Sequence, residues 1–129
     1  MRKVIIENEV VNQLVGLRQK LITSQGMSKG ENTFQKIISS IDNLGIYSTL
    51  GRNIKIYYNV DCPDNWYLLT SHRNYFVFSK TEELITVLKM YDEKQDFIND
   101  LFGISMRSRE SIDYWEESYF PIIIKSIDA

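Results

Sequence analysis

The stretch SHRNYFVFSKTEELITVLKMYDEKQDF, residues 71–97, decides the predicted fold. It holds two apolar segments, NYFVFS (74–79) and LITVLKM (84–90), joined by the short hydrophilic link KTEE. Runs of β-branched and aromatic residues between polar links are typical of β-strands. The stretch therefore predicts an antiparallel hairpin. A histidine and an arginine stand at its entrance, and the charged cluster DEKQD stands at its exit.

Two further segments before this hairpin have strand character. WYLLT (66–70) is the first, and it is separated from the hairpin by SHR. NIKIYYNV (53–60) is the second, because its apolar side chains at Ile54, Ile56 and Tyr58 alternate with Lys55 and Tyr57. Four consecutive strands with short links predict an antiparallel meander.

The N-terminal part of the chain has a different period. RKVII (2–6) predicts a short first strand, and apolar residues then recur at helical spacing to about residue 24. SQGMSKGEN (24–32) is rich in Gly and Ser and predicts a break before a second helix, with Gly45 as its C-cap glycine. The fold class is therefore α+β: an N-terminal strand, a helical hairpin and a four-stranded meander that the hairpin covers on one face. The apolar stripe of the second helix is formed by Phe34, Ile37, Ile38, Ile41 and Leu44.

The C-terminal part predicts more helix. DEKQDFINDLFG (92–103) has the pattern of a short helix, and a further helix ends before Pro121. We expect a body over residues 1–104 and a C-terminal helical extension, 105–129, packed on or beside it. The extension contains WEESYFPIII, whose large apolar residues either pack back onto the sheet or form a surface for a partner.

Composition restricts the class of protein. The chain has 129 residues and 12% aromatic residues, which is typical of one folded domain and not of a disordered chain. The net charge of −2 gives no bulk electrostatic case for binding nucleic acid. With one cysteine, one histidine and no glycine-rich phosphate loop, we expect no metal site, no cofactor and no disulfide. The absence of a long apolar run predicts a cytoplasmic protein without a membrane anchor.

Several stretches, in order along the chain, resemble the RelE/ParE superfamily of bacterial toxins. RKVIIENEVVNQL is similar to the family's opening strand and first helix, and NTFQKIISSIDNL is similar to its second helix. TLGRNI resembles the entry to its sheet, although the proline often found before that glycine is missing. HRNYFVFSKTEELITVLKMYDEKQDF resembles the late strands. The resemblance covers about residues 2–103.

This resemblance implies the toxin of a type II toxin–antitoxin module, with a cognate antitoxin protein as its partner. One branch of the family cleaves mRNA on the ribosome, and the other poisons DNA gyrase. We expect ribosome-dependent mRNA cleavage, so the protein would be an endoribonuclease. A ParE-like gyrase inhibitor and a non-catalytic protein-interaction domain on the same fold are the alternatives.

RNA cleavage of this kind needs a base for the 2′-OH, a proton donor for the leaving oxygen and cations for the phosphorane. An imidazole suits proton transfer and an arginine fork suits a phosphate. Where many relatives carry a histidine directly after the last strand, this chain has Asp92, whose carboxylate would repel a phosphate. That departure weakens the ribonuclease hypothesis more than the gyrase one. The predicted catalytic residues are Arg73, His72, Lys89, Tyr91 and Lys94, and the predicted substrate-binding residues are Arg52, Lys55 and Tyr75.

Overall fold

The computed structural model describes residues 1–47 and 49–92. These residues fall into two compact units, one formed by Met1–Gly51 with Tyr67–Asp92 and the other containing Arg52–Trp66. Three predictions lie outside the described residues: the helix over 92–103, the extension over 105–129 and the candidate Lys94. The first residue of that predicted helix, Asp92, is described and is the last residue of a strand. None of the helices within the described part of the chain is long and apolar enough to cross a membrane.

The larger unit is built on a mixed sheet. Within it the strands lie in the order β1 (Lys3–Ile6), β5 (Leu84–Asp92), β4 (Asn74–Lys80) and β3 (Trp66–Ser71). β4 and β5 are antiparallel, whereas β1 runs parallel to β5 with Lys3 opposite Leu84. The strands predicted at 2–6, 66–70, 74–79 and 84–90 are confirmed, and the fold class is α+β.

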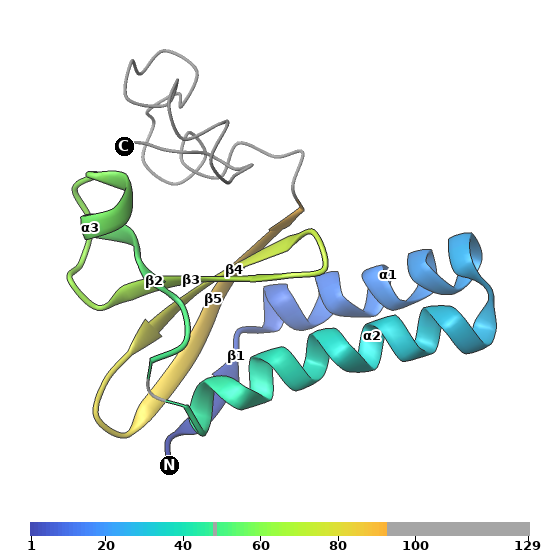
Figure 1. Cartoon of the computed structure of the whole chain (residues 1–129), viewed down its shortest axis with the longest axis horizontal. Helices are drawn as coiled ribbons and strands as arrows, with labels where there is room; N and C mark the ends of the chain where they lie inside the picture. The colour runs from blue at the N-terminus through green and yellow to red at the C-terminus, as the bar shows by residue number, and fades with distance from the viewer. Residues whose placement is uncertain (48, 93–129) are drawn as a thin grey trace. The chain divides into compact units, whose positions relative to one another are not determined.

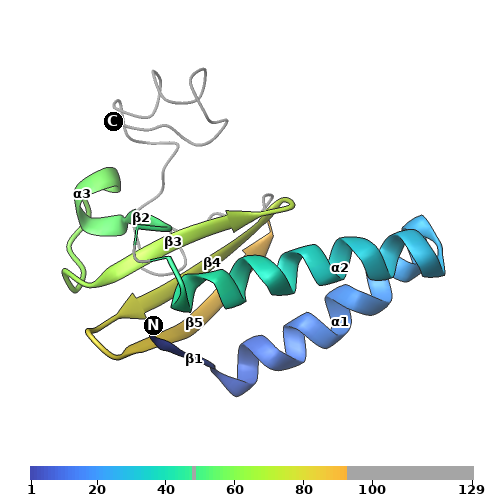
Figure 2. The ribbon, with the colours of Figure 1, turned by 60° about the horizontal axis from the view of Figure 1, so that its bottom comes forward.

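Two antiparallel helices, α1 (Asn8–Gln25) and α2 (Met27–Asp42), cover one face of these strands (Figures 1 and 2). Burial of apolar surface stabilises a fold by about 25 cal/mol per Å², and the packing of the hairpin against the strands supplies the core of this unit. The core residues come from α1, α2, the short 3₁₀ helix η1 (Asn43–Gly45), β3, β4 and β5: Val10, Leu14, Ile37, Ile41, Leu44, Leu69, Phe76, Phe78, Ile85, Val87 and Met90.

The break predicted over 24–32 is wrong, because the two helices are separated by Gly26 alone. Gly26 has φ of 93°, a conformation that glycine adopts without a steric penalty. Residues 27–32 have the composition of a loop but form the first turns of α2. Packing explains the difference: Gly30 is buried, and its backbone lies directly against the backbone of Leu21 and Ile22 on α1.

Gly45 is also not the predicted C-cap of the second helix. α2 ends at Asp42, Asn43 is its C-cap, and Gly45 closes η1. The amide of Arg2 donates to the carbonyl oxygen of Gly45 at 2.7 Å, and a Cβ on Gly45 would collide with the carbonyl oxygen of Arg2. Glycine at this position lets the start of the chain approach η1 closely.

The strand predicted over 53–60 is wrong. The structure has a two-residue strand β2 (Arg52–Asn53) followed by a short helix α3 (Ile54–Tyr58), so the long strands of the predicted meander are β3, β4 and β5. Asn53 caps the helix by accepting a hydrogen bond from the amide of Ile56 at 2.9 Å. Asn59 then ends it in the left-handed conformation. Ile54 and Tyr58, one helical turn apart, are both buried, while Ile56 is 81% exposed.

Candidate functional site

The link between β3 and β4 consists of His72 and Arg73, and both have positive φ, 49° and 69°. Two-residue hairpin turns of this conformation favour Asn-Gly or Gly-Gly, because the left-handed region costs other residues roughly 1–2 kcal/mol each. The buried side chain of Asn74 supports the turn, since its amide donates to the carbonyl oxygen of His72 at 2.9 Å. The turn therefore presents a histidine and an arginine at a position where smaller residues would be more stable.

The imidazole of His72 is oriented by a chain of hydroxyl groups. Ser40 donates to the carbonyl oxygen of Lys36 at 3.0 Å, and the buried Ser71 donates to Ser40 at 3.0 Å. Each hydroxyl has one proton, so Ser71 has none left for Nδ1 of His72, which lies 3.2 Å from its oxygen. His72 must therefore donate from Nδ1. In the neutral ring, this leaves Nε2 as a hydrogen-bond acceptor.

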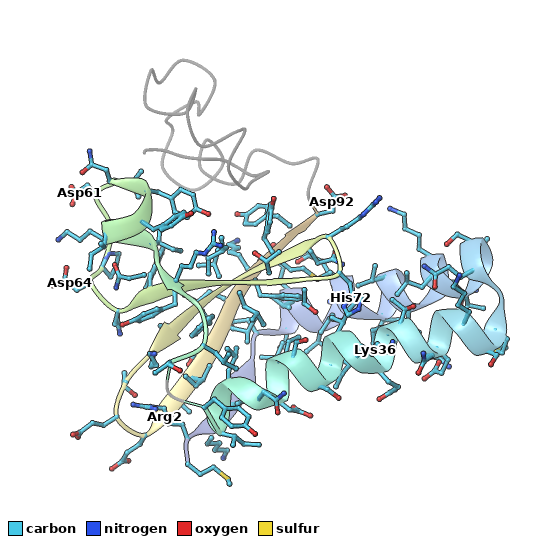
Figure 3. All side chains as sticks on the ribbon, in the orientation of Figure 1. Arg2, Lys36, Asp61, Asp64, His72 and Asp92 are labelled. Atoms are coloured by element: carbon cyan, nitrogen blue, oxygen red, sulfur yellow. The ribbon has the colours of Figure 1, made fainter. Side chains whose placement is uncertain are left out.

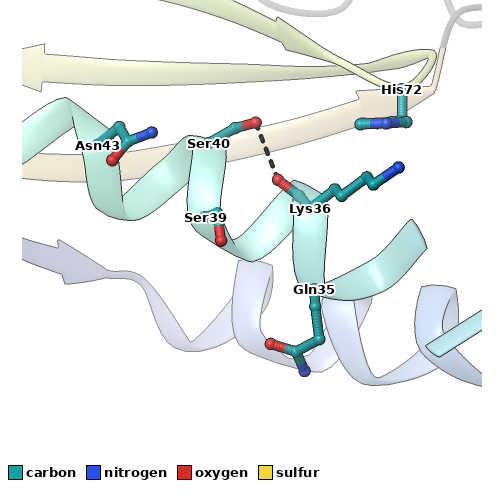
Figure 4. A pocket seen from close by; sticks show the side chains of 6 residues that line it. All are labelled: Gln35, Lys36, Ser39, Ser40, Asn43 and His72. Carbon is teal, nitrogen blue, oxygen red and sulfur yellow. Dashed lines mark hydrogen bonds between the residues drawn. The ribbon is translucent and has the colours of Figure 1, made fainter. Parts of the chain in front are cut away.

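An open cleft of about 410 Å³ lies between this turn and α2 (Figure 4). Lys36 and Ser40 extend from α2 on the side where the ring of His72 lies. No carboxylate is among the residues that line the cleft in the described part of the chain. The lining residues are Gln35, Lys36, Ser39, Ser40, Asn43 and His72.

Sequence reasoning selected His72 but missed the α2 side of this cleft. The signal was present: Lys36, Ser40 and Asn43 form a polar stripe at i, i+4 and i+7. It was overlooked because the apolar stripe of the same helix already explained the helix as a core element.

The entrance and exit of the β4–β5 hairpin meet at one end of the sheet. Asn74 lies opposite Asp92 and Tyr75 lies opposite Tyr91 in the register of the two strands. Figure 3 labels His72 in the turn and Asp92 at the end of β5. Asp92, the described residue of the exit cluster, therefore lies near the His72–Arg73 turn, and Tyr75 and Tyr91 form a cross-strand pair. Tyr91 is only 5% exposed.

Lys89, the candidate on the last strand, lies opposite Val77 beside an irregularity in the ladder. Its ammonium is 3.1 Å from a carboxylate oxygen of Glu9 on α1, and both side chains are substantially exposed. This contact holds Lys89 toward the first helix. A lysine engaged in this way must break an ion pair before it can contact a phosphate.

The two cationic candidates of the 52–66 segment have partners within that segment. The guanidinium of Arg52 lies over the ring of Tyr57 at 4.6 Å. Lys55 donates to Asp64 at 2.8 Å. That hydrogen bond, together with the charge of each partner, raises the pKa of Lys55 and lowers the pKa of Asp64.

The remaining reactive group of the same segment is the thiol of Cys62. Burial raises the pKa of this thiol, which disfavours the nucleophilic thiolate. Among the described residues, no group of three or more His, Cys, Asp or Glu side chains could hold a metal ion.

Comparison with known proteins gives the fold. No protein-family model matches the chain, and no curated protein matches it. One chain of a solved structure described as "Chromosomal ParDE TA system from P. aeruginosa" matches with a TM-score of 0.56 and 15% sequence identity. The match covers 71% of this chain and 96% of that chain. The protein therefore has the α+β fold of a chain from a toxin–antitoxin system, and this fold fits the predicted RelE/ParE-like arrangement.

Proposed function

We propose that this protein is the toxin of a toxin–antitoxin module. The observation that carries the proposal is the structural match to a ParDE chain, which extends over almost the whole of that chain. The order of the sequence stretches that resemble RelE/ParE toxins supports it independently. A cognate antitoxin is then the expected partner. A fold hosts many functions, so the proposal requires an activity test.

Inhibition of DNA gyrase by binding is the mode of action that the described residues favour. Cleavage of RNA would need several cationic groups around one phosphate, but Lys89 is paired with Glu9 on the side of α1. Lys55 is paired with Asp64. Asp92 lies in register with the first residue after the His72–Arg73 turn, where it adds negative charge. A binding mode needs a complementary surface and no assembled catalytic set.

Ribosome-dependent mRNA cleavage is the second candidate, and one observation favours it. The hydroxyl chain through Ser71 leaves Nε2 of His72 as an acceptor, which is the state that a general base requires. Arg73 is the next residue in the chain and supplies a guanidinium for the scissile phosphate. In this mode His72 would accept the proton of the 2′-OH.

The test is induced expression in bacteria with growth as the first readout. We expect growth arrest with the wild type and its relief when the gene adjacent to this one is expressed with it. Loss of supercoiling by purified gyrase upon addition of the protein would support the gyrase mode. New mRNA ends that disappear in His72→Ala and Arg73→Ala would support cleavage instead.

Lys29→Ala is the matched control, since Lys29 is an exposed cation on α2 outside the cleft and makes no described ion pair. It should arrest growth as the wild type does. Normal growth at wild-type expression levels, with folded protein recovered from the cells, would overturn the proposal and favour an interaction domain on the same fold.

A further inference from the structure

We propose that the cleft between α2 and the β3–β4 turn binds a small phosphate monoester, with Lys36, Asn43 and His72 as its polar anchors. The proposal concerns the helix-covered side of the larger unit and does not rest on the toxin role.

The size of the cleft follows from its sequence. Its α2 side carries the adjacent residues Ser39 and Ser40 in the last turn of the helix, and their side chains are small. Ser40 lies between Lys36 and Asn43 and fills little space, so the volume beside His72 stays open at about 410 Å³. Sites for small molecules typically occupy ~300–1,000 Å³.

The charged residues that line the cleft favour an anionic ligand. Lys36 makes no ion pair among the described residues, and the lining residues include no Asp or Glu. Glu31, one turn earlier on α2, is engaged by Arg18 at 2.7 Å and by Gln35 at 3.1 Å. A further cation, Arg73, follows His72 in the turn. An anionic ligand would thus meet an ammonium that no described carboxylate neutralises.

The imidazole distinguishes a phosphate monoester from a carboxylate. The Ser71 hydroxyl fixes Nδ1–H, so Nε2 is the atom that remains for a ligand. A phosphate monoester can retain one proton near neutral pH and donate it to Nε2, whereas a carboxylate is ionised there and offers only acceptors. Lys36 donates to a second oxygen, and the Asn43 amide offers a donor and an acceptor at the far end.

The backbone of the turn supports a binding role. His72 occupies a left-handed conformation that costs a non-glycine residue stability, and the buried Asn74 holds its carbonyl oxygen in place. An Asn-Gly turn would join β3 and β4 with less strain. Two contacts hold the histidine in this conformation, one from Asn74 to its carbonyl oxygen and one between Ser71 and its ring.

The experiment is a titration of the full-length protein followed by NMR, with inorganic phosphate, 5′-AMP and adenosine as separate probes. His72 is the single histidine of the chain, so its ring signals report on the cleft without assignment ambiguity. We expect saturable shifts of these signals and of the amides of Lys36 and Asn43 with phosphate and 5′-AMP, but not with adenosine.

Variants separate a built site from general charge attraction. Lys36→Gln should weaken 5′-AMP binding about fivefold, which corresponds to the loss of one exposed ion pair. Lys29→Gln removes the same charge from the same helix outside the cleft and should leave binding unchanged. Ser71→Ala should also weaken binding, because the ring loses its acceptor for Nδ1–H.

Three results would overturn the proposal: no saturable shift with the wild type, equal shifts with adenosine and 5′-AMP, or equal weakening in Lys36→Gln and Lys29→Gln. The wild-type titration decides the question even if a variant fails to fold. Growth arrest is measured separately, so failure of this site and failure of the toxin role remain distinguishable.

Discussion

The larger unit and the 52–66 segment are stabilised by different kinds of contact. In the larger unit, side chains from α1, α2, η1 and three strands form one buried apolar cluster. The segment buries three apolar side chains, Ile54, Tyr58 and Val60. It also has a set of polar contacts: a helix cap from Asn53, an ion pair between Lys55 and Asp64, and a cation–π contact between Arg52 and Tyr57. Exposed ion pairs contribute only about 0–1 kcal/mol.

The difference teaches where local change is tolerated. A five-residue helix such as α3 is far shorter than the ~12–15 residues that an isolated helix needs in water. Its conformation therefore depends on its two ends and on the burial of Ile54 and Tyr58. The strands of the larger unit are fixed by cross-strand pairing, and β3, β4 and β5 are fixed also by the burial of the side chains that join the apolar cluster. We expect large and global effects from core substitutions, and small and local effects from changes to the exposed positions and polar contacts of the segment.

Phe76→Ala is the substitution with the largest expected effect. Phe76 is completely buried on β4 in the apolar cluster. Truncation of such a side chain costs about 3–5 kcal/mol through lost burial and the cavity left behind. Urea unfolding followed by circular dichroism should show a much lower midpoint with a similar slope. Ile56→Ala, on the exposed face of α3, should change stability by less than about 0.5 kcal/mol. Equal effects would contradict the comparison.

Two glycine substitutions sharpen the comparison within the helical hairpin. Gly30→Ala should destabilise the protein by about 1–3 kcal/mol, because its Cβ would lie 2.6 Å from the carbonyl oxygen of Leu21. Gly16→Ala should stabilise it by about 0.5–1 kcal/mol, since Gly16 is inside α1 and a Cβ there meets nothing within 4 Å. Thermal unfolding should show a lower melting temperature for Gly30→Ala and a higher one for Gly16→Ala. Loss of stability in both would mean that α1 is packed on its Gly16 face.

The larger unit was largely predictable because its residues follow long, regular periods. Three long strands, the first strand and the stripe of α2 were all indicated by apolar spacing. The single-residue link at Gly26 could not be predicted in this way, because the approach of Gly30 to α1 is a tertiary contact that composition cannot reveal. The parallel pairing of β1 with β5 likewise joins residues some 80 positions apart in sequence.

The segment was mispredicted because its period is ambiguous over a few residues. Ile54, Ile56 and Tyr58 alternate as in a strand, but Ile54 and Tyr58 also satisfy the i, i+4 spacing of a helix. Asn53 and Asn59 decide between the two through their capping and left-handed conformations. At the candidate site, the pairing of Ser71 with Ser40 links residues 31 positions apart, so the orientation of His72 could not be inferred from sequence.

Asn53→Ala tests how far α3 depends on its cap. The Asn53 side chain accepts from the Ile56 amide and donates to the carbonyl oxygen of Asp64 at 2.6 Å. Loss of an N-cap costs about 0.5–2 kcal/mol. Hydrogen exchange should show faster exchange at Ile56, while amides of β4 and β5 keep their protection. If the strand amides also lost protection, the segment and the larger unit would be opening together.

The smallest expected effect is a pH dependence of the same segment. The hydrogen bond from Lys55 and its charge lower the pKa of Asp64 in the folded protein. A group with a lowered pKa stabilises the fold above its unfolded pKa, and this contribution is lost as the pH falls through the folded pKa. The Lys55 pKa is raised by the same contact, so its contribution is lost as the pH rises through the raised value. Both side chains are well exposed, which keeps the effect small.

Hydrogen exchange of the 52–66 amides should therefore be slowest, after correction for intrinsic rates, between these two pH limits. Asp64→Asn should remove the acid limb and most of the alkaline limb, because the raised pKa of Lys55 depends mainly on Asp64. Lys55→Met should remove both limbs, since neither partner then has an opposite charge. Asp61→Asn is the control for the acid limb, because Asp61 is a neighbouring carboxylate that has no described ion pair and acts on the pKa of Lys55 only through its charge. An acid limb that persists in Asp64→Asn would mean that some other carboxylate controls the segment, and the ion pair would then be incidental to its stability.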